Sequence, residues 1–354
     1  MKKKLISGGI LVIFIIFLSV LCVRIKPDEQ VKEEEVKPLF KLGVILPADE
    51  TEQYTKEQID TITDAMLKAG LDTDSVIWKE RVAGGGAYSA AKDLVSDDCT
   101  MIVATCGVYT VEMTEFAAEY PQVQVVTVTD TELLQRSENL YTVQLDTRKA
   151  CYISGVIAGM KLADLHEKGK IPEEDYQTDG RVRIGYVAKY GEAESSTEYM
   201  EFLRGVRSTF SKVTMEIRFT GVRLDLDAEA SAADTLVRSG CVLIACNTES
   251  ERVPAVVNRA RENGNLVYLA GYHDSLPEKS STECTGIIKD WKQYYNELFG
   301  AVAAESEFPA EWKKGYDDGI VTVLRKKLDD EEKERIKRAE KIWEETNQMK
   351  NIIY

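Results

Sequence analysis

Short apolar runs alternate along most of this chain with longer segments in which apolar residues recur at helical spacing. Residues 41–47 are an apolar run bounded by proline, and residues 56–70 keep helical spacing until Gly70. Three more strand-like runs and two more helical runs follow, in the order SVIWKERV, AYSAAKDLVSDD, TMIVATCG, TVEMTEFAAEYP and VQVVTVTD. Because parallel strands are joined by crossovers, usually helical, this alternation predicts a doubly wound parallel sheet.

The same pattern starts again at residue 181. Its strand-like and helical runs are RVRIGYVAKY, SSTEYMEFLRGVRSTF, VTMEIRFTG, AEASAADTLVRSG, CVLIACNT, RVPAVVNRARENG and LVYLAGYHD. A long helical segment at 148–169 joins the two halves, and the charged tail at 329–350 predicts a surface helix. The sequence therefore predicts an α/β protein with two parallel-sheet lobes, between whose facing carboxyl edges a ligand would bind.

The first 24 residues predict the compartment. MKKK precedes an uncharged apolar run at residues 5–23. A helix of that length rises about 28 Å at 1.5 Å per residue, which is close to the thickness of the bilayer hydrocarbon core. Because the preceding lysines favour a cytoplasmic N-terminus, we expect the rest of the chain on the extracytoplasmic face of the cell membrane.

Cys22 leaves two interpretations of this segment open. LSVLC resembles a bacterial lipoprotein signal peptide, in which the cysteine is lipidated after cleavage, but Leu21 stands where that pattern has Gly, Ala or Ser. An uncleaved transmembrane anchor is the alternative, and either form tethers the protein to the membrane. Residues 25–39 are densely charged and lack apolar periodicity, which predicts an acidic, flexible tether.

Composition excludes several classes of function. The net charge is −15, from 45 basic and 60 acidic residues, whereas a nucleic-acid-binding protein needs a basic surface. The sequence has two histidines, His166 and His273, which leaves few ways to build a histidine-rich metal site or a Ser-His-Asp triad. Walker-type loops and dinucleotide-binding glycine turns are also missing, so we expect no cofactor, no metal and no enzymatic activity.

Cysteine usage does not decide between thiols and disulfides. Six cysteines follow Cys22, and four of them lie in apolar segments: Cys106, Cys151, Cys241 and Cys246. Export permits disulfides, but buried free thiols are the better interpretation in such segments.

Several stretches, taken in their order, resemble the basic-membrane-protein (BMP), or purine-nucleoside-receptor-like, substrate-binding proteins of ABC transporters. They are KLGVILP, FAAEYPQVQVVTV, RKACYISGVIAGM, RIGYVAKY with FLRGVRS, LVYLAGYHD, and KKGYDDGIVTV with the helix after it. The resemblance spans roughly residues 40–350 and implies the type I periplasmic-binding-protein fold, in which a hinge joins the lobes. On that pattern we expect residues 40–147 and 275–300 to form lobe 1, residues 148–274 and 301–328 to form lobe 2, and residues 329–354 to form a C-terminal helix.

The same resemblance suggests ligand-binding residues in the first half. The family has an aspartate loop and a Ser-Phe-Asn turn after its first strand. This chain has ADETEQYTKEQ there, in which Asp49 could accept hydrogen bonds and Tyr54 could stack on a base. A helix-capping role is the alternative for Asp49. The turn CGVYT keeps the family's glycine as Gly107 and offers Tyr109.

Four further candidates lie in the second half. Asn247 ends one strand, and the family's ribose-binding acid falls on His273, with Asp274 adjacent. The family's later lysine corresponds to Lys289 in TGIIKDW. Tyr190 and Tyr199 could also stack on a base, although a structural role suits them better.

The resemblance implies a membrane-tethered solute-binding protein of an ABC importer, which closes its lobes over a nucleoside or similar small molecule and delivers it to a permease. A Med-like, membrane-anchored regulator or sensor of the same fold is the alternative. A permanent anchor and divergent site residues favour the regulator, whereas a lipidated Cys22 and nucleoside binding favour transport.

Overall fold

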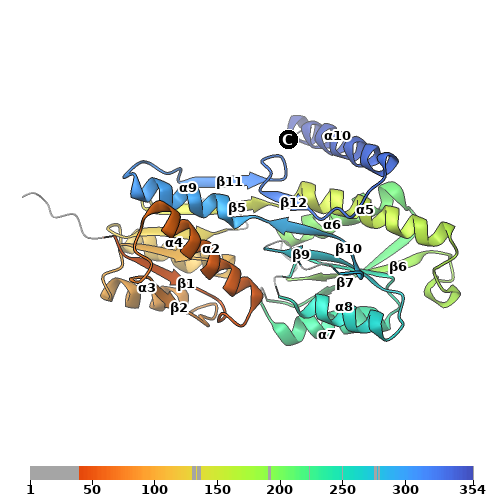
Figure 1. The fold of residues 1–354 in the computed structure, drawn as a ribbon, viewed down its shortest axis with the longest axis horizontal. Coiled ribbons are helices and arrows are strands. Elements are labelled where there is room, and N and C mark those ends of the chain that lie inside the picture. The colour runs from red at the N-terminus through yellow and green to blue at the C-terminus, as the bar shows by residue number, and fades with distance from the viewer. Residues whose placement is uncertain are drawn as a thin grey trace, which may run out of the picture. The chain divides into compact units, whose positions relative to one another are not determined.

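Two six-stranded sheets organise the chain in the computed structural model (Figure 1). The structure describes residues 40–353 except 130–132, 134–136, 190–192, 223, 249, 275–276 and 278–279, and it does not describe the side chains of 193–196 and 348–353. The predicted apolar run, Cys22 and the acidic tether therefore lie outside the described residues. Within the described part of the chain, no helix is both long and apolar enough to cross a bilayer.

The first lobe contains a fully parallel sheet with the strand order β11-β5-β4-β3-β1-β2. In chain order its elements are β1 (Leu42–Ile45), α2 (Gln53–Ala69), β2 (Ile77–Lys79), α3 (Ala87–Ser96), β3 (Met101–Ala104), the 3-10 turn η1 (Gly107–Tyr109), α4 (Thr110–Glu119), β4 (Gln124–Val128), β5 (Leu140–Asp146), α9 (Trp291–Ala303) and β11 (Glu311–Gly315).

The second lobe contains a sheet with the order β12-β10-β9-β8-β6-β7, in which the edge strand β12 alone runs antiparallel to its neighbour. Its elements are α5 (Arg148–Glu167), the 3-10 turn η2 (Glu173–Asp175), β6 (Val182–Ala188), α6 (Ala193–Thr209), β7 (Val213–Phe219), α7 (Leu226–Arg238), β8 (Leu243–Cys246), α8 (Arg252–Glu262), β9 (Tyr268–His273), β10 (Glu283–Lys289), β12 (Val321–Val323) and α10 (Asp330–Ile353).

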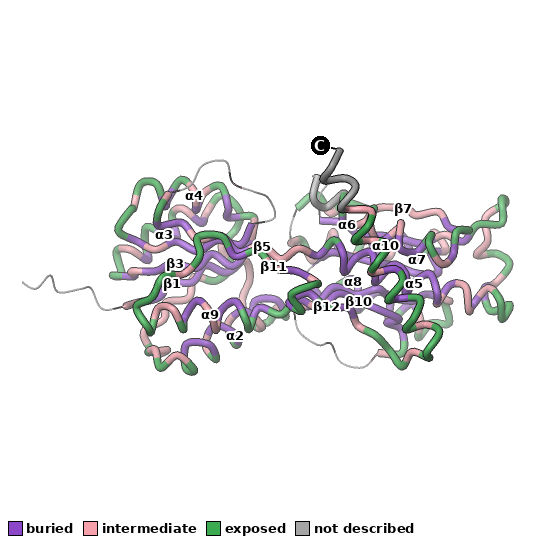
Figure 2. The backbone as a smooth tube through the Cα atoms, turned by 90° about the horizontal axis from the view of Figure 1, so that it is seen from above, coloured by how far each residue is buried: buried purple, intermediate pink, exposed green. Residues whose placement is uncertain are grey.

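Helices cover both faces of each sheet, so the central strands are buried along most of their length (Figure 2). In the first lobe, α2 and α9 pack on one face and α3 and α4 on the other. In the second lobe, α5 pairs with α6 and α7 pairs with α8. Strands buried on both faces are continuous apolar runs, which is why the sequence pattern reveals them.

Helices α5 and α6 approach each other unusually closely, and three glycines make this possible. A Cβ atom built on Gly155 or Gly205 would lie within 3.0 Å of backbone atoms of the facing helix, closer than real side chains approach. A Cβ atom on Gly159, one turn after Gly155, would likewise lie within 3.0 Å of Val206 and Thr209. The segment 148–169, predicted as the connecting helix, is therefore also the main packing partner of α6.

The expectation of two parallel-sheet α/β lobes is confirmed, and most predicted strands and helices are present. The pattern did not predict β5, α9 or β10 as separate elements. The assignment of residues 275–300 to lobe 1 and 301–328 to lobe 2 is wrong for two strands: β10 joins the second sheet and β11 joins the first. The reason is that the chain crosses between the lobes twice more after β10, at residues 289–291 and 315–321, and short strands carry no sequence mark of the sheet they enter.

The six cysteines in the described part of the chain, from Cys99 to Cys284, are all buried free thiols. Burial raises the pKa of the Cys241, Cys246 and Cys284 thiols to about 12. They therefore behave as small apolar side chains rather than as nucleophiles.

Candidate functional site

A polar cavity of about 930 Å³ lies where the first turn of α2 faces α8, the end of β9, Pro277 and residues 280–283. It is thus lined by both lobes, at the edge where the parallel strands β1 and β9 end. This is the edge at which open α/β sheets bind their ligands. Its lining side chains are Gln53, Tyr54, Glu57, Glu251, Pro254, Asn258, Arg261, Glu262, Leu269, Tyr272, His273, Asp274, Pro277, Ser280, Ser281, Thr282 and Glu283.

Lys289 and Asp274 form a buried ion pair beside this cavity. Lys289 Nζ lies 2.9 Å from Asp274 Oδ1, and both side chains are less than 5% exposed. The indole Nε1 of Trp291 donates to the same carboxylate oxygen over 2.6 Å. The pairing follows from the sheet register, because His273 is opposite Ile288 and the next positions, Asp274 and Lys289, are therefore opposite each other.

Three aromatic rings surround the Lys289 ammonium. Its Nζ lies 4.5 Å from the ring centroid of Tyr272 and 6.0 Å from those of Tyr54 and Trp291. Aromatic faces stabilise a desolvated cation through their quadrupoles. Tyr54 comes from the first lobe and Tyr272 from the second, so this ammonium group connects the two walls of the cavity.

Glu198 forms the centre of a second buried cluster. Its carboxylate accepts hydrogen bonds from the Thr147 hydroxyl, from Asn247 Nδ2 over 2.6 Å and from the Tyr272 hydroxyl over 3.3 Å. Asn247 Oδ1 in turn accepts from the backbone N–H of Lys189 over 3.1 Å. Because Thr147 lies at the crossing from β5 to α5, this carboxylate ties the hinge to the ends of β6, β8 and β9.

His273 points to the opposite face of β9 and forms a different charged pair. Its Nε2 lies 2.7 Å from Glu283 Oε1, and its Nδ1 lies 3.9 Å from Glu251 Oε1. Burial lowers the pKa of His273, but the hydrogen bonds to Glu251 and Glu283 and their negative charge outweigh burial and raise it to about 9. The imidazole is therefore a cation at neutral pH.

Two glycines make room for the His273–Glu283 pair. A Cβ atom on Gly271 would lie within 3.0 Å of both partners, and one on Gly286 would meet Glu283 in the same way. The two glycines are opposite each other in the register of β9 and β10. Because glycine has no side chain, the His273 and Glu283 side chains can lie directly over the strands at these two positions.

In the first lobe, Asp49 is bound within its own loop. Its carboxylate accepts hydrogen bonds from the side chain and backbone of Thr51 and from Arg81, and these bonds lower the pKa of Asp49 in that order of strength. It does not cap α2, whose N-cap is Glu52. Asp49 is not part of the cavity lining.

The remaining first-lobe candidates differ in position. Tyr54 lines the cavity, and its hydroxyl donates to the carbonyl oxygen of Thr105 at the end of β3. Tyr109 is fully buried under α3 and α4, and its hydroxyl donates to the Val82 carbonyl over 2.6 Å. Gly107 begins η1, where its carbonyl accepts from Thr110 over 2.8 Å.

The structure therefore brings together Tyr54, Asn247, His273, Asp274 and Lys289 at or beside the cavity, and places Asp49, Gly107 and Tyr109 elsewhere in the first lobe. Tyr199 packs edge-on against Tyr186 and Phe219, and Tyr190 lies outside the described residues.

The sequence did not point to five members of the two clusters: Thr147, Lys189, Glu198, Tyr272 and Trp291. Lys189 and Tyr272 lie at the ends of predicted strands, and that position alone could have marked them as candidates. Glu198 is one acid among many on a charged helix and carried no such signal. In the described ranges, no group of three or more His, Cys, Asp or Glu side chains is arranged to hold a metal ion.

Comparison with protein families gives one match: the model of the Bmp family, described as ABC transporter substrate-binding protein PnrA-like, matches residues 55–353. No curated protein matches the chain in sequence.

Solved structures share the fold at low sequence identity. A transcriptional activator of the comK gene from Bacillus halodurans has a TM-score of 0.61 at 16% identity, over 86% of this chain and 97% of that one. An ABC transporter solute-binding protein from Aeropyrum pernix K1 has a TM-score of 0.66 at 15% identity, over 81% and 76%. A carbohydrate transporter solute-binding protein from Agrobacterium radiobacter, in complex with D-arabinose, has a TM-score of 0.57 at 14% identity, over 81% and 94%. These likenesses confirm the periplasmic-binding-protein type of fold.

Proposed function

The chain belongs to the Bmp family of PnrA-like ABC transporter substrate-binding proteins, and from that premise we propose that it binds a nucleoside in the cavity between α2 and β9. The bound solute would be delivered to an ABC permease at the extracytoplasmic face of the membrane. The N-terminal apolar run would tether the protein there, through lipidated Cys22 or as an uncleaved anchor. The proposal assigns the protein no chemical step.

The observation that carries this proposal is the position of Asp274. Both of its described contacts, with Lys289 and Trp291, use Oδ1, and the residue also lines the cavity. Oδ2 is therefore the oxygen that would accept hydrogen bonds from the vicinal hydroxyls of a ribose. Hydrogen bonds accepted by a carboxylate are stronger than those between neutral groups.

The rest of the cavity suits a solute with a flat ring and several hydroxyl groups. Tyr54 and Tyr272 supply aromatic faces, and Gln53, Asn258 and Ser280 supply amide and hydroxyl groups. Ligand sites of this kind combine apolar surface with a few well-placed polar groups. A solute touching both α2 and β9 would favour the closed arrangement of the lobes, because only that arrangement provides all its contacts.

Calorimetric titration with nucleosides tests the proposal. A charge-assisted hydrogen bond contributes about 1.5–3 kcal/mol, so Asp274→Asn is expected to weaken binding by about ten- to a hundredfold. Asp49→Asn removes the same charge outside the cavity and is expected to leave binding unchanged. A 2′-deoxynucleoside should bind more weakly than its ribonucleoside to the wild type and equally well to Asp274→Asn. Equal binding of the two nucleosides to the wild type would contradict ribose recognition by Asp274.

A regulator or sensor of the same fold is the second candidate, and one observation favours it. The buried polar groups beside the cavity already satisfy one another, as in the bonds of Glu198 to Thr147, Asn247 and Tyr272. A site of this kind needs no ligand to be stable. Native mass spectrometry of the purified chain separates the candidates: a co-purified nucleoside supports transport, whereas a ligand-free protein that gives no heat with any nucleoside supports the regulator.

A further inference from the structure

The chain passes between the two lobes at three segments, residues 146–148, 289–291 and 315–321, and these segments contact one another. The Asp290 backbone N–H donates to the Ile320 carbonyl over 2.9 Å, which joins the second crossing to the third. Gly315 lies opposite Asp146 in the pairing of β11 with β5, so close that a Cβ atom on it would meet the Asp146 carbonyl at 2.7 Å. Any rotation of the lobes must change the backbone angles of these segments together.

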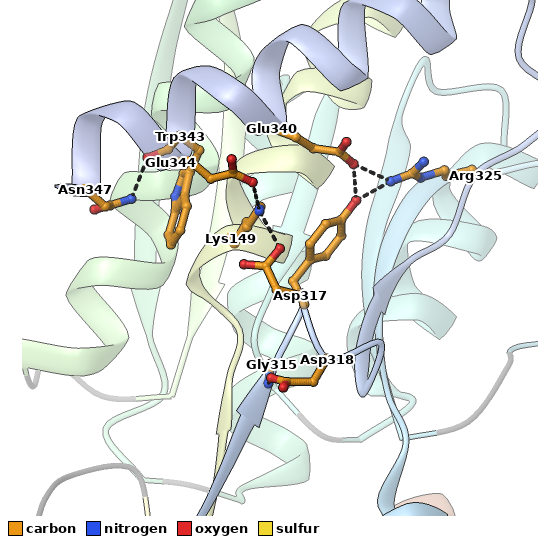
Figure 3. A network of polar contacts seen from close by, with 10 residues as sticks. Lys149, Gly315, Asp317, Asp318, Arg325, Glu340, Trp343, Glu344 and Asn347 are labelled. Atoms are coloured by element: carbon orange, nitrogen blue, oxygen red, sulfur yellow. Dashed lines mark hydrogen bonds and ion pairs between the residues drawn. The ribbon is translucent and has the colours of Figure 1, made fainter.

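One ammonium group binds the first crossing to the third and to the C-terminal helix. Lys149, in the first turn of α5, contacts the carboxylates of Asp317 and Glu344, the latter over 2.7 Å (Figure 3). The Lys149 side chain is only 5% exposed. Burial alone would lower the pKa of Lys149, but the two hydrogen bonds raise it above its usual value. Asp317 belongs to the third crossing, and Glu344 belongs to α10.

A second set of contacts runs from α10 to the same crossing. The Tyr316 hydroxyl donates to the Glu340 carboxylate, and Arg325 donates to both, with 3.0 Å between Arg325 and Glu340 (Figure 3). The rings of Tyr316 and Trp343 also flank the Lys149 ammonium, with centroids 5.4 and 5.6 Å away. Glu340 thus bonds directly to Tyr316, and Glu344, one turn later on α10, reaches the neighbouring Asp317 through Lys149.

Helix α10 is itself anchored on the second lobe. Ile336 and Ala339 are buried in the hydrophobic core of that lobe, and the helix packs along α5. Leu328 and Trp343 add partly buried contacts to the same core. The helix therefore belongs to the second lobe. Its Glu340 bonds to Tyr316, in the segment through which the chain leaves the first lobe, and its Glu344 bonds to Lys149, which also holds Asp317 of that segment.

We propose that helix α10 is a brace on the hinge, which holds the crossing segments through Glu340 and Glu344 and restrains rotation of the two lobes. The restraint comes from hydrogen bonds and ion pairs of Glu340 and Glu344 with Lys149, Tyr316 and Arg325. Anything that displaces these two carboxylates would therefore weaken it. The proposal is independent of which solute the cavity binds.

Hydrogen exchange measured by mass spectrometry on the full chain tests the brace. The variant Glu340→Gln/Glu344→Gln keeps side-chain volume and removes both charges. We expect the hydrogen-bonded hinge amides of Asp290, Gly319 and Ile320 to exchange at least about tenfold faster. The matched control Glu334→Gln/Glu345→Gln alters two acids of the same helix, which pair with Lys337 and Lys341 of that helix.

Each result decides the proposal. Faster exchange confined to the crossing segments, in the brace variant and not in the control, supports it. Unchanged hinge amides overturn it, and so does equal acceleration throughout β3 and β8, because that would mean general destabilisation.

Lobe motion is measured separately by electron paramagnetic resonance between spin labels at Lys68→Cys and Lys212→Cys, in a Cys22→Ser background. Both positions are exposed, and the described native cysteines are buried, so the labels report on α2 of the first lobe and on the start of β7. The brace predicts a broader distance distribution in Glu340→Gln/Glu344→Gln than in the control variant. Distributions of equal width would overturn it.

Discussion

The two lobes contribute very differently to the cavity between them. The second lobe places buried ionisable groups in or beside its wall: the Lys289–Asp274 pair, Glu198 with its three donors, and the His273–Glu283 pair. The first lobe contributes Tyr54, the exposed Gln53 and the partly buried Glu57 from the start of α2. Asp49, another first-lobe candidate, is bound to Thr51 and Arg81 in its own loop.

If the cavity binds a solute as proposed, the second lobe would supply the fixed polar contacts and the first lobe would mainly cover the solute. Buried charges require fixed partners, because an unpaired charge in a protein interior is costly. They therefore make one wall of the cavity rigid. The first-lobe wall has one anchored ring, Tyr54, and side chains that adapt at little cost.

The largest expected effect comes from breaking the buried pair of the second lobe. Asp274→Ala leaves the Lys289 ammonium buried without its carboxylate, which we expect to lower the free energy of unfolding by about 3–5 kcal/mol in urea titrations. The double variant Asp274→Leu/Lys289→Met removes both charges and should recover most of that loss. A single variant as stable as the wild type would show that this wall does not depend on its charges.

The second prediction concerns pH. The pKa of His273 is raised to about 9, from 6.5 in an unpaired histidine. Below pH 6.5 both folded and unfolded chains hold the proton, so the stabilisation is fully present. Between pH 6.5 and 9 the unfolded chain releases the proton first, so stability falls as pH rises.

The loss over this range is expected to be about 3 kcal/mol, at 1.4 kcal/mol for each pKa unit. It is measured as the difference in the free energy of unfolding between the wild type and His273→Gln, from denaturant titrations at several pH values. Glu283 and Glu251, which face the imidazole of the wild type, are present in both proteins. A constant difference across the range would mean that His273 is not charged in the folded protein.

A third prediction compares two glycine positions, one in each lobe. Gly271→Ala forces a methyl group against His273 and Glu283, so we expect a loss of about 1–3 kcal/mol. Gly300→Ala, in helix α9 of the first lobe, points into open space and should stabilise the protein by up to about 1 kcal/mol. Differential scanning calorimetry of the two variants should give melting temperatures that move in opposite directions.

The smallest effect is expected at Asp49. Its partner Arg81 is 77% exposed, so solvent screens the pair, and Asp49→Ala should destabilise the protein only slightly and by less at high salt. Thermal unfolding at low and high salt would check this. A cost as large as that of Asp274→Ala would remove the contrast between the lobes.

The sequence predicted most of the fold because buried parallel strands and amphipathic helices have different periods. It missed β5, because the alternating residues of LYTVQLD mark a half-buried strand rather than a buried one. It misassigned β10 and β11, because sheet membership depends on crossings that lie far from either strand in sequence.

For the site, the sequence identified polar residues at strand ends, but not their partners. Asn247, Asp274 and Lys289 were all candidates, and the structure shows the first bound to Glu198 and the other two bound to each other. Tyr109 was an equally good candidate by the same reasoning, yet it is fully buried and bound to Val82. A position at the end of a strand predicts that the residue lies at that edge of the sheet, but it does not predict where the side chain points.

By itself, the sequence determined that this chain folds into two parallel-sheet lobes, because the apolar pattern of each segment reflects how that segment is buried. The tertiary structure alone decided which charges meet. The contacts of Lys289 with Asp274, of His273 with Glu283 and of Lys149 with Glu344 depend on sheet register and helix packing, which bring together residues whose separation in sequence ranges from 10 to 195 positions. No local sequence pattern predicts such a pairing, because nothing in the neighbouring sequence distinguishes either partner from an ordinary charged residue.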